Sequence, residues 1–140
     1  MSNQPTWLDE QTITLPDGTS AVRSYDQEED MLEIFFSDGM ATATIELTDG
    51  VYLRFDRQRY EPLSLAMLAF QARMQQQEFG EPLLAFDGLA QLPETERRQV
   101  LQMLKRPPLT YVLHLYSFQP SAQARTMPVA SMMEPMAVPA

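Results

Sequence analysis

Residues 25–56 read YDQEEDMLEIFFSDGMATATIELTDGVYLRFD. Apolar and polar side chains alternate here in three short runs, residues 31–36, 41–46 and 51–56, and turns containing Asp-Gly separate the runs. A period of two residues is typical of β-strands that bury one face. Because links this short cannot carry a parallel crossover, the stretch predicts an antiparallel β-meander.

The residues before this stretch predict one more hairpin. Residues 12–15 and 21–25 have strand character, and Asp17-Gly18 lies between them. Glycine adopts the positive φ that a tight hairpin turn requires. We therefore expect the first two strands to pair and to extend the sheet.

After Ser64 the pattern changes to a helical one. Residues 65–77 contain no Gly or Pro and are rich in strong helix formers, and Met67 and Met74 share one apolar stripe. Ser64 is a suitable N-cap. The sequence therefore predicts a first helix from Ser64 to Gln77, packed against the sheet.

The remaining residues predict three further elements. Residues 83–86 form a short apolar run that favours a strand. Pro93 starts a second helix, which Pro107-Pro108 ends, and acidic residues in its first turn and basic ones in its last suit the helix dipole. Residues 109–118 are apolar on both faces, which predicts either an interior strand or an edge strand that awaits a partner.

The chain divides into two parts by composition. Its 140 residues suit one domain, and residues 1–118 are predicted to form a single α+β domain. Residues 119–140 contain 4 of the 11 prolines and 4 of the 10 methionines, and they are predicted to be a flexible tail or to lie in a partner's apolar groove. The candidate partner-binding residues of this tail are Met132, Met133 and Met136.

A second group of candidate partner-binding residues lies on the sheet. Phe35 and Tyr52 share the face that carries Glu33 and Arg54. This face is therefore not uniformly polar, and either the helices of the same chain or a partner protein covers its apolar residues.

The net charge of −9 is confined to one half of the sequence. Residues 1–61 contain 13 Asp and Glu against 4 Arg, whereas residues 62–140 contain 6 acidic and 6 basic residues. Such a field repels nucleic acid and anionic lipid and favours a basic protein partner. The alternative is an acidic surface that serves solubility.

The residues required by most catalytic chemistries are missing. The chain has no cysteine and a single histidine, His114, which lies in a strand pattern. Asp26, Glu28 and Asp30 have the alternate spacing of a calcium loop, but Met31 stands where such a loop requires glycine. No phosphate-binding or hydrolase motif occurs. We expect neither enzyme activity nor a cofactor or metal.

The ends and the apolar runs of the chain bear on where the protein resides. The N-terminal residues have no basic or apolar region of a signal peptide. No apolar run approaches the roughly 20 residues that a membrane span requires. These features predict a cytoplasmic protein without a membrane span.

Several residues of the opening stretch carry a resemblance to a known family. They are Tyr25, Asp26, Glu28, Asp30, Leu32 and Ile34, followed by Glu46, Asp49-Gly50-Val51, Leu53 and Asp56. Together they resemble the domain of unknown function 2283 family over about residues 24–66. The resemblance implies another strand at residues 60–65, where the residue pattern favours the start of a helix. It also implies an antitoxin-like protein or an accessory partner of a small basic toxin.

These observations favour a non-catalytic protein-interaction module. It would be antitoxin-like or an accessory subunit of a larger assembly, and a homo-oligomer remains open. The alternative is a small ligand-binding protein or enzyme with a pocket between the sheet and the first helix, in which His114 is the one group that titrates near neutral pH.

Overall fold

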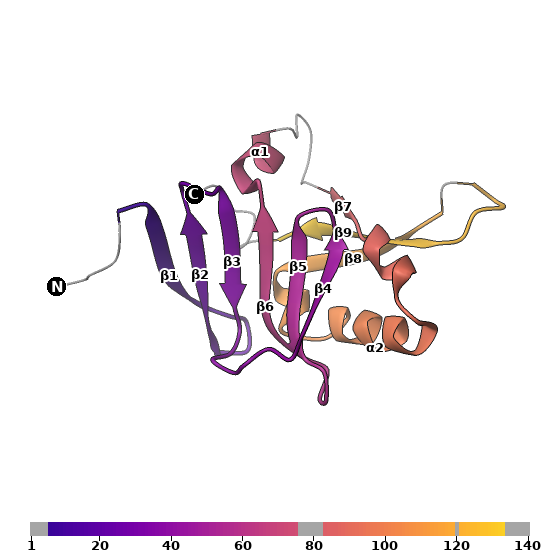
Figure 1. The fold of residues 1–140 in the computed structure, drawn as a ribbon, viewed down its shortest axis with the longest axis horizontal. Helices are drawn as coiled ribbons and strands as arrows, with labels where there is room; N and C mark the ends of the chain where they lie inside the picture. Colours follow the sequence, from indigo (N-terminus) through magenta and orange to yellow (C-terminus); the bar gives the residue numbers. More distant parts are fainter. Residues whose placement is uncertain (1–5, 76–82, 120, 134–140) are drawn as a thin grey trace.

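Six strands form the larger of two sheets in the computed structural model, which describes residues 6–75, 83–119 and 121–133. They are β1 (Leu8–Thr14), β2 (Ser20–Asp26), β3 (Met31–Phe35), β4 (Ala43–Thr48), β5 (Val51–Asp56) and β6 (Glu61–Leu68). All neighbouring strands are antiparallel, and their order is β1-β2-β3-β6-β5-β4 (Figure 1). The α+β class and the antiparallel sheet are thus confirmed.

The predicted first hairpin is present. β1 and β2 pair from Leu8 with Asp26 to Thr14 with Ser20. Gly18 has a φ of +89°, and the Leu15 amide donates a hydrogen bond of 2.8 Å to the Thr19 carbonyl. The Asp-Gly turn therefore acts as its chemistry indicates.

The predicted simple meander is wrong because β6 lies between β3 and β5. β3 pairs with β6, with Ile34 opposite Leu65, and β5 pairs with the other side of β6, with Leu53 opposite Leu65. The connection from β3 to β4 runs along one end of the sheet, past β6 and β5, to reach the far edge (Figure 1). The seven residues 36–42 are enough for this crossing. A short connection between two strands therefore does not show that the strands are neighbours in the sheet.

The predicted helix from Ser64 to Gln77 is also wrong in its first half, which is strand β6. All residues from Leu63 to Met67 are buried, and two neighbouring strands satisfy their backbone groups. A strand buried on both faces gives a continuous apolar run, which periodicity cannot distinguish from a buried helix. The helix α1 (Phe70–Gln75) begins only after Ala69, whose φ is +55°. The strand that the family resemblance implied is therefore present.

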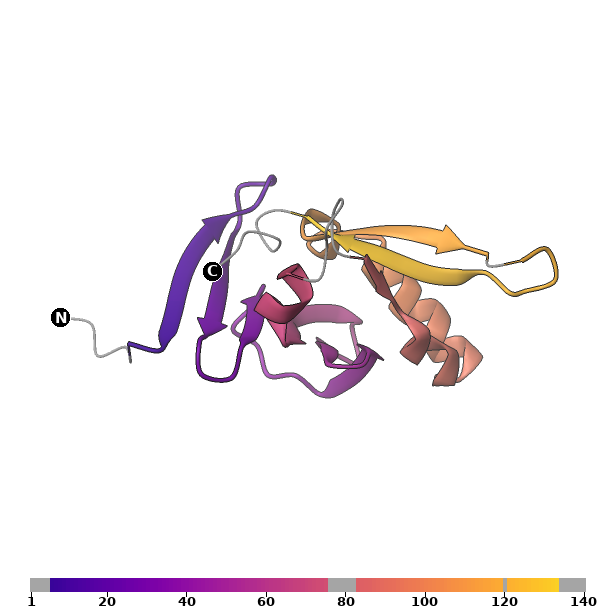
Figure 2. The same cartoon turned by 90° about the horizontal axis from the view of Figure 1, so that it is seen from above.

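The second layer contains a three-stranded sheet and most of the helical residues. Its elements are β7 (Leu83–Ala85), the 3-10 helix η1 (Asp87–Gln91), α2 (Glu94–Leu104), the 3-10 helix η2 (Leu109–Tyr111), β8 (Leu113–Phe118) and β9 (Met127–Met132). α2 begins after Pro93 and ends before the two prolines, as predicted. The layer lies against one face of the β4–β6 half of the large sheet (Figures 1 and 2).

The prediction of a flexible tail is wrong for its central part, because β9 is the middle strand of the small sheet. β9 pairs with β7 on one side and β8 on the other, in the order β7-β9-β8. Ala130 and Met132 are fully buried. The sequence of residues 127–132 alone does not predict a core strand, because the burial of β9 depends on partner strands about 15 and 45 residues earlier in the chain.

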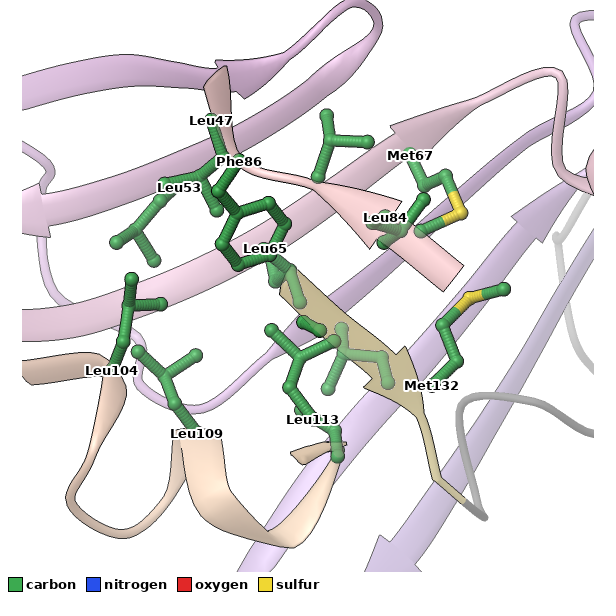
Figure 3. Packing of buried hydrophobic residues seen from close by; sticks show 14 of the residues in the cluster. Leu47, Leu53, Leu65, Met67, Leu84, Phe86, Leu104, Leu109, Leu113 and Met132 are labelled. Atoms are coloured by element: carbon green, nitrogen blue, oxygen red, sulfur yellow. The ribbon is translucent and has the colours of Figure 1, made fainter. Parts of the chain in front are cut away.

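The core lies between the two sheets. Leu47, Leu53, Leu65 and Met67 contribute from the large sheet, and Leu84, Phe86, Leu104, Leu109, Leu113 and Met132 from the second layer. The ring of Phe86 points into the space between the layers, toward Leu53 and Leu65 (Figure 3). Burial of such apolar surface is the main force that joins the layers.

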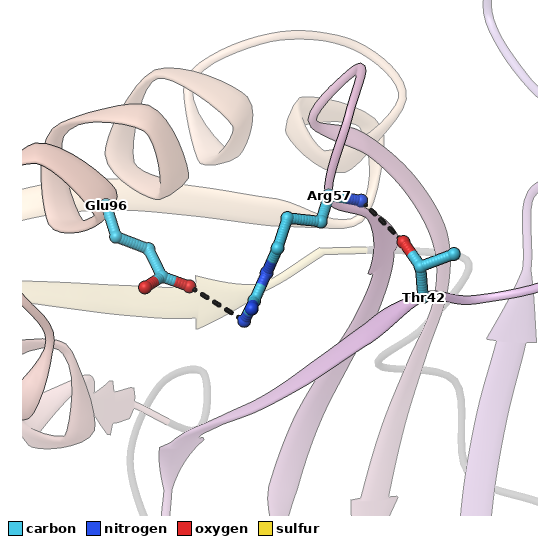
Figure 4. Close-up of polar contacts among 3 residues, drawn as sticks. All are labelled: Thr42, Arg57 and Glu96. Carbon is cyan, nitrogen blue, oxygen red and sulfur yellow. Dashed lines mark hydrogen bonds and ion pairs between the residues drawn. The ribbon is translucent and has the colours of Figure 1, made fainter.

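Two contacts fix the second layer at the edge of the large sheet. Gly88 in η1 approaches the β4 backbone so closely that a Cβ there would overlap the Glu46 carbonyl oxygen. The second contact is made by Arg57, in the turn after β5. Its backbone amide donates a hydrogen bond to Thr42 Oγ1 at 2.8 Å, and its guanidinium group donates to Glu96 Oε1 on α2 at 3.2 Å (Figure 4). The Arg57–Glu96 ion pair is partly exposed, so it orients α2 relative to the large sheet more than it stabilises the fold.

We expect Gly88→Ala to lower the free energy of unfolding by about 1–3 kcal/mol, because the added methyl group forces η1 away from β4. Urea denaturation measures the effect. Gly39→Ala is the matched control, since a Cβ there meets side-chain atoms and no backbone, namely Leu63 Cδ2 at 3.2 Å and Ser37 Oγ at 3.5 Å. Equal losses in the two variants would contradict the close approach.

We expect Met132→Ala to lower the free energy of unfolding by about 2–5 kcal/mol, as core truncations do. Met40→Ala, at a side chain that is 88% exposed, should change it by less than about 0.5 kcal/mol. A small and equal effect in both variants would show that β9 is not part of the folded core.

Candidate functional site

The predicted sheet residues Phe35 and Tyr52 lie on the outer face of the large sheet, opposite the second layer. Both side chains are half-buried. A polar network separates them, in which Ser64 Oγ donates to Glu33 Oε2 at 2.7 Å and Arg54 lies 3.5 Å from the same carboxylate. Within the described residues no helix covers this face, but its apolar residues do not form a continuous surface.

The predicted methionines of the tail have different positions. Met132 is fully buried in the core of its own chain, which leaves no surface for a partner. Met133 is half-buried, and its amide donates to the Val112 carbonyl at 2.8 Å. Met136 lies outside the described residues.

A more continuous apolar surface lies on the outer face of the small sheet, which we call the apolar face. Seven of its residues are Leu83, Ala85, His114, Tyr116, Phe118, Met127 and Val129, and the buried Ser131 lies between Leu83 and His114 on the same face. The strand register places them on one side, with Ala85 and Tyr116 flanking Val129 and with Phe118 opposite Met127. Leu83, Tyr116 and Phe118 are 59%, 46% and 53% exposed. None of these seven residues carries a carboxylate, an amine or a guanidinium.

The sequence predicts only part of this surface. The predicted strand that ends at Phe118 is apolar on both faces, which fits the position of β8 at the edge of the small sheet. The sequence does not place Leu83 and Val129 on the same surface, because their common face depends on the pairing of β9. Alternation of Met127, Val129 and Ser131 is too weak a signal by itself.

His114 belongs to the apolar face. It is exposed, and its ring centroid lies 4.5 Å from that of Tyr116. The predicted alternative is a pocket between the sheet and the first helix, on which Met67 and Met74 lie. Met67 belongs to strand β6 instead and is fully buried. A hollow of about 410 Å³ lies elsewhere, between the β5–β6 turn and the end of α2.

The acidic turn after Tyr25 has a structural role. The Tyr25 hydroxyl donates to Asp30 Oδ1 at 2.7 Å, and the same oxygen accepts the Gln71 amide at 2.8 Å. Asp30 therefore caps the first turn of α1 from a distant part of the sequence. The ring of Tyr25 also packs edge-on against Phe70, with 5.9 Å between centroids.

These contacts shift two pKa values in opposite directions. Partial burial alone would raise the pKa of Asp30, but the hydrogen bonds from the Gln71 amide, the Tyr25 hydroxyl and the Ala72 amide bring it below its ordinary value. Burial first, and then the hydrogen bond to Asp30, raise the pKa of Tyr25 to about 12. The pair is thus set to hold the proton on the tyrosine.

Metal sites and membrane-spanning helices are both absent from the described residues. Among residues 6–75, 83–119 and 121–133, no group of three or more His, Cys, Asp or Glu side chains is placed to hold a metal ion. No helix in the same part of the chain is long and apolar enough to cross a membrane.

We expect Asp30→Ala to lower the free energy of unfolding at neutral pH by about 1 kcal/mol, the usual effect of a lost helix cap. The stabilisation by Asp30 requires the carboxylate, so it is present above the ordinary aspartate pKa and is lost as the pH falls through the lowered folded pKa. The stabilisation by Tyr25 is present below the ordinary tyrosine pKa near 10 and is lost as the pH rises toward about 12. Denaturation curves at several pH values measure both effects.

Asp38→Ala is the control for the acidic limb, because Asp38 is an exposed aspartate in the turn after β3. Tyr25→Phe is the control for the alkaline limb and should remove the additional loss above pH 10. Parallel pH profiles for all variants would show that the pair does not couple to folding.

Comparison with known proteins adds a family and nothing more specific. No curated protein and no solved structure shows significant similarity to the chain. The matching family is described as "Protein of unknown function (DUF2283)", and its match begins in β2 and ends in the turn after β5. The resemblance predicted from the sequence is therefore confirmed, and residues 23–59, just over a quarter of the chain, match the DUF2283 family.

Proposed function

We propose that the protein is a non-catalytic interaction module that binds another protein through the apolar face. The observation that carries this proposal is the exposure of Leu83, Tyr116 and Phe118 on one side of the small sheet. Single exposed apolar side chains are common on soluble proteins, but several together are typical of binding sites. Aromatic side chains are also the usual energetic centres of interfaces.

The edge of β8 supports the same proposal. In the described part of the chain β8 pairs only with β9, so its other edge offers backbone hydrogen-bonding groups. A partner strand could add to this edge while its side chains contact Tyr116 and Phe118. The apolar face and the free edge are adjacent and would act together.

The charge of the chain favours a basic partner. A net charge of −9 attracts a positively charged protein and opposes association between two copies. An antitoxin-like protein bound to a small basic toxin fits this charge, and so does an accessory subunit of a larger assembly. Both forms use the same surface.

We expect the full chain, purified from its native cells with an affinity tag, to retain a partner in stoichiometric amount. The double variant Tyr116→Asp/Phe118→Asp should bind this partner at least about tenfold more weakly, because it places charge in the interface. Met40→Asp is the control, since Met40 is more exposed but lies in the loop after β3, away from the apolar face.

Circular dichroism of the double variant should match that of the native protein, because both side chains are about half exposed. Two results would contradict the proposal. One is a native protein that sediments as a monomer and retains no partner, and the other is a folded double variant that retains the partner with unchanged affinity.

A further inference from the structure

The hollow at the end of α2 has the composition of a small binding site. Phe36, Tyr60 and Met103 give it apolar walls, and two arginines, Arg59 and Arg106, line it from separate elements. Its volume of about 410 Å³ lies within the range of pockets that hold small molecules. One carboxylate, that of Glu61, also lines it.

The two guanidinium groups are available for a ligand. Arg106 donates through Nη2 to the Tyr60 carbonyl at 3.2 Å, which positions the side chain and leaves its other donors free. Arg59 makes no hydrogen bond or ion pair with another residue in the described ranges. Two such groups from different elements can hold the oxygens of a carboxylate with charge-assisted hydrogen bonds.

The surroundings of the hollow carry positive charge although the chain is acidic. Six of the ten basic residues belong to residues 57–59 and 97–106. Acidic neighbours pair two of them, Arg57 with Glu96 and Arg98 with Glu94. Local attraction for an anion therefore opposes the repulsion from the rest of the molecule.

The wall formed by Tyr60 is held in a fixed conformation. Its φ of +51° is unusual for a residue with a side chain, and its ring stacks on that of Phe55 with 5.7 Å between centroids. Backbone conformations of this kind persist only where the surrounding structure holds them, and they cluster at functional sites. The hollow is therefore shaped before a ligand arrives.

We propose that this hollow binds a carboxylate that is attached to an aromatic or apolar group. Arg59 and Arg106 hold the carboxylate, and Phe36, Tyr60 and Met103 contact the apolar part. A single negative charge fits better than a phosphate dianion, because Glu61 offsets one of the two guanidinium charges. The carboxylate comes either from a free small acid or from the C-terminus of a peptide. Binding at the hollow is independent of the proposed binding of a protein at the apolar face.

The test is a titration of the ¹⁵N-labelled full chain, followed by amide chemical shifts, with phenylacetate and with an N-acetylated dipeptide that ends in phenylalanine. We expect saturable shifts at residues 59–61 and 105–106 with at least one of them. Tighter binding of the dipeptide would assign the site to peptide ends, and tighter binding of phenylacetate would assign it to free acids. Phenylacetamide, which has no charge, should not saturate the site.

Arg59→Gln should weaken binding at least about tenfold, the effect of losing one charge-assisted hydrogen bond. This variant keeps the fold, because Arg59 contacts no described residue through a polar bond, whereas Arg106→Gln also loses the bond to Tyr60. Arg98→Gln removes a charge on α2 outside the hollow and should bind as the native protein does. Unchanged affinity in Arg59→Gln, equal binding of phenylacetamide, or the absence of saturable shifts would overturn the proposal.

Discussion

The pairing of β6 with β3 on one side and β5 on the other is the constraint on which the rest of the structure depends. β6 joins strands β1–β3 to the β4–β5 hairpin. Without β6 these two units would not be connected by strand pairing, because β3 and β4 are not neighbours in the sheet. Its Leu65 and Met67 face the second layer and are fully buried. The end of β6 also places Phe70 and α1 over Tyr25, so the acidic turn and the helix depend on the same strand.

Local chemistry decided which parts of this fold the sequence could predict. Gly18 and the residues around Asp49-Gly50 specify turns through their backbone conformation, and Pro93 specifies a helix start, so these elements were predicted correctly. The sequence favours a helix at β6 because residues 63–67, which are buried on both faces of the sheet, lack the alternation of a half-buried strand. β9 was missed because nothing within residues 127–132 reveals the two strands between which it lies.

The same distinction applies to the candidate sites. Phe35 and Tyr52 were selected from a period of two and do share the outer face of the large sheet, but Glu33 and Ser64 interrupt it. Asp26 and Asp30 belong to an acidic cluster, yet both carboxylates have structural partners. Asp26 accepts a hydrogen bond from the Glu29 amide of the turn, and Asp30 accepts from the Tyr25 hydroxyl and from the Gln71 amide of α1. The family pattern at these positions thus has a structural explanation. The apolar face and the arginine-lined hollow both combine residues far apart in the sequence, so the sequence predicts only the β8 part of the face and does not predict the hollow.

The central place of β9 in the small sheet has a consequence for the order in which the protein can fold during synthesis. β7 and β8 are both made before β9, yet in the folded sheet they are not neighbours, because β9 lies between them. The nascent chain therefore lacks the partner of both strands, which helps to cover Leu84 and Leu113, until residues 127–132 emerge. A chain that ends before residue 127 would therefore expose the strand edges with which β9 pairs, and exposed edges of this kind favour aggregation.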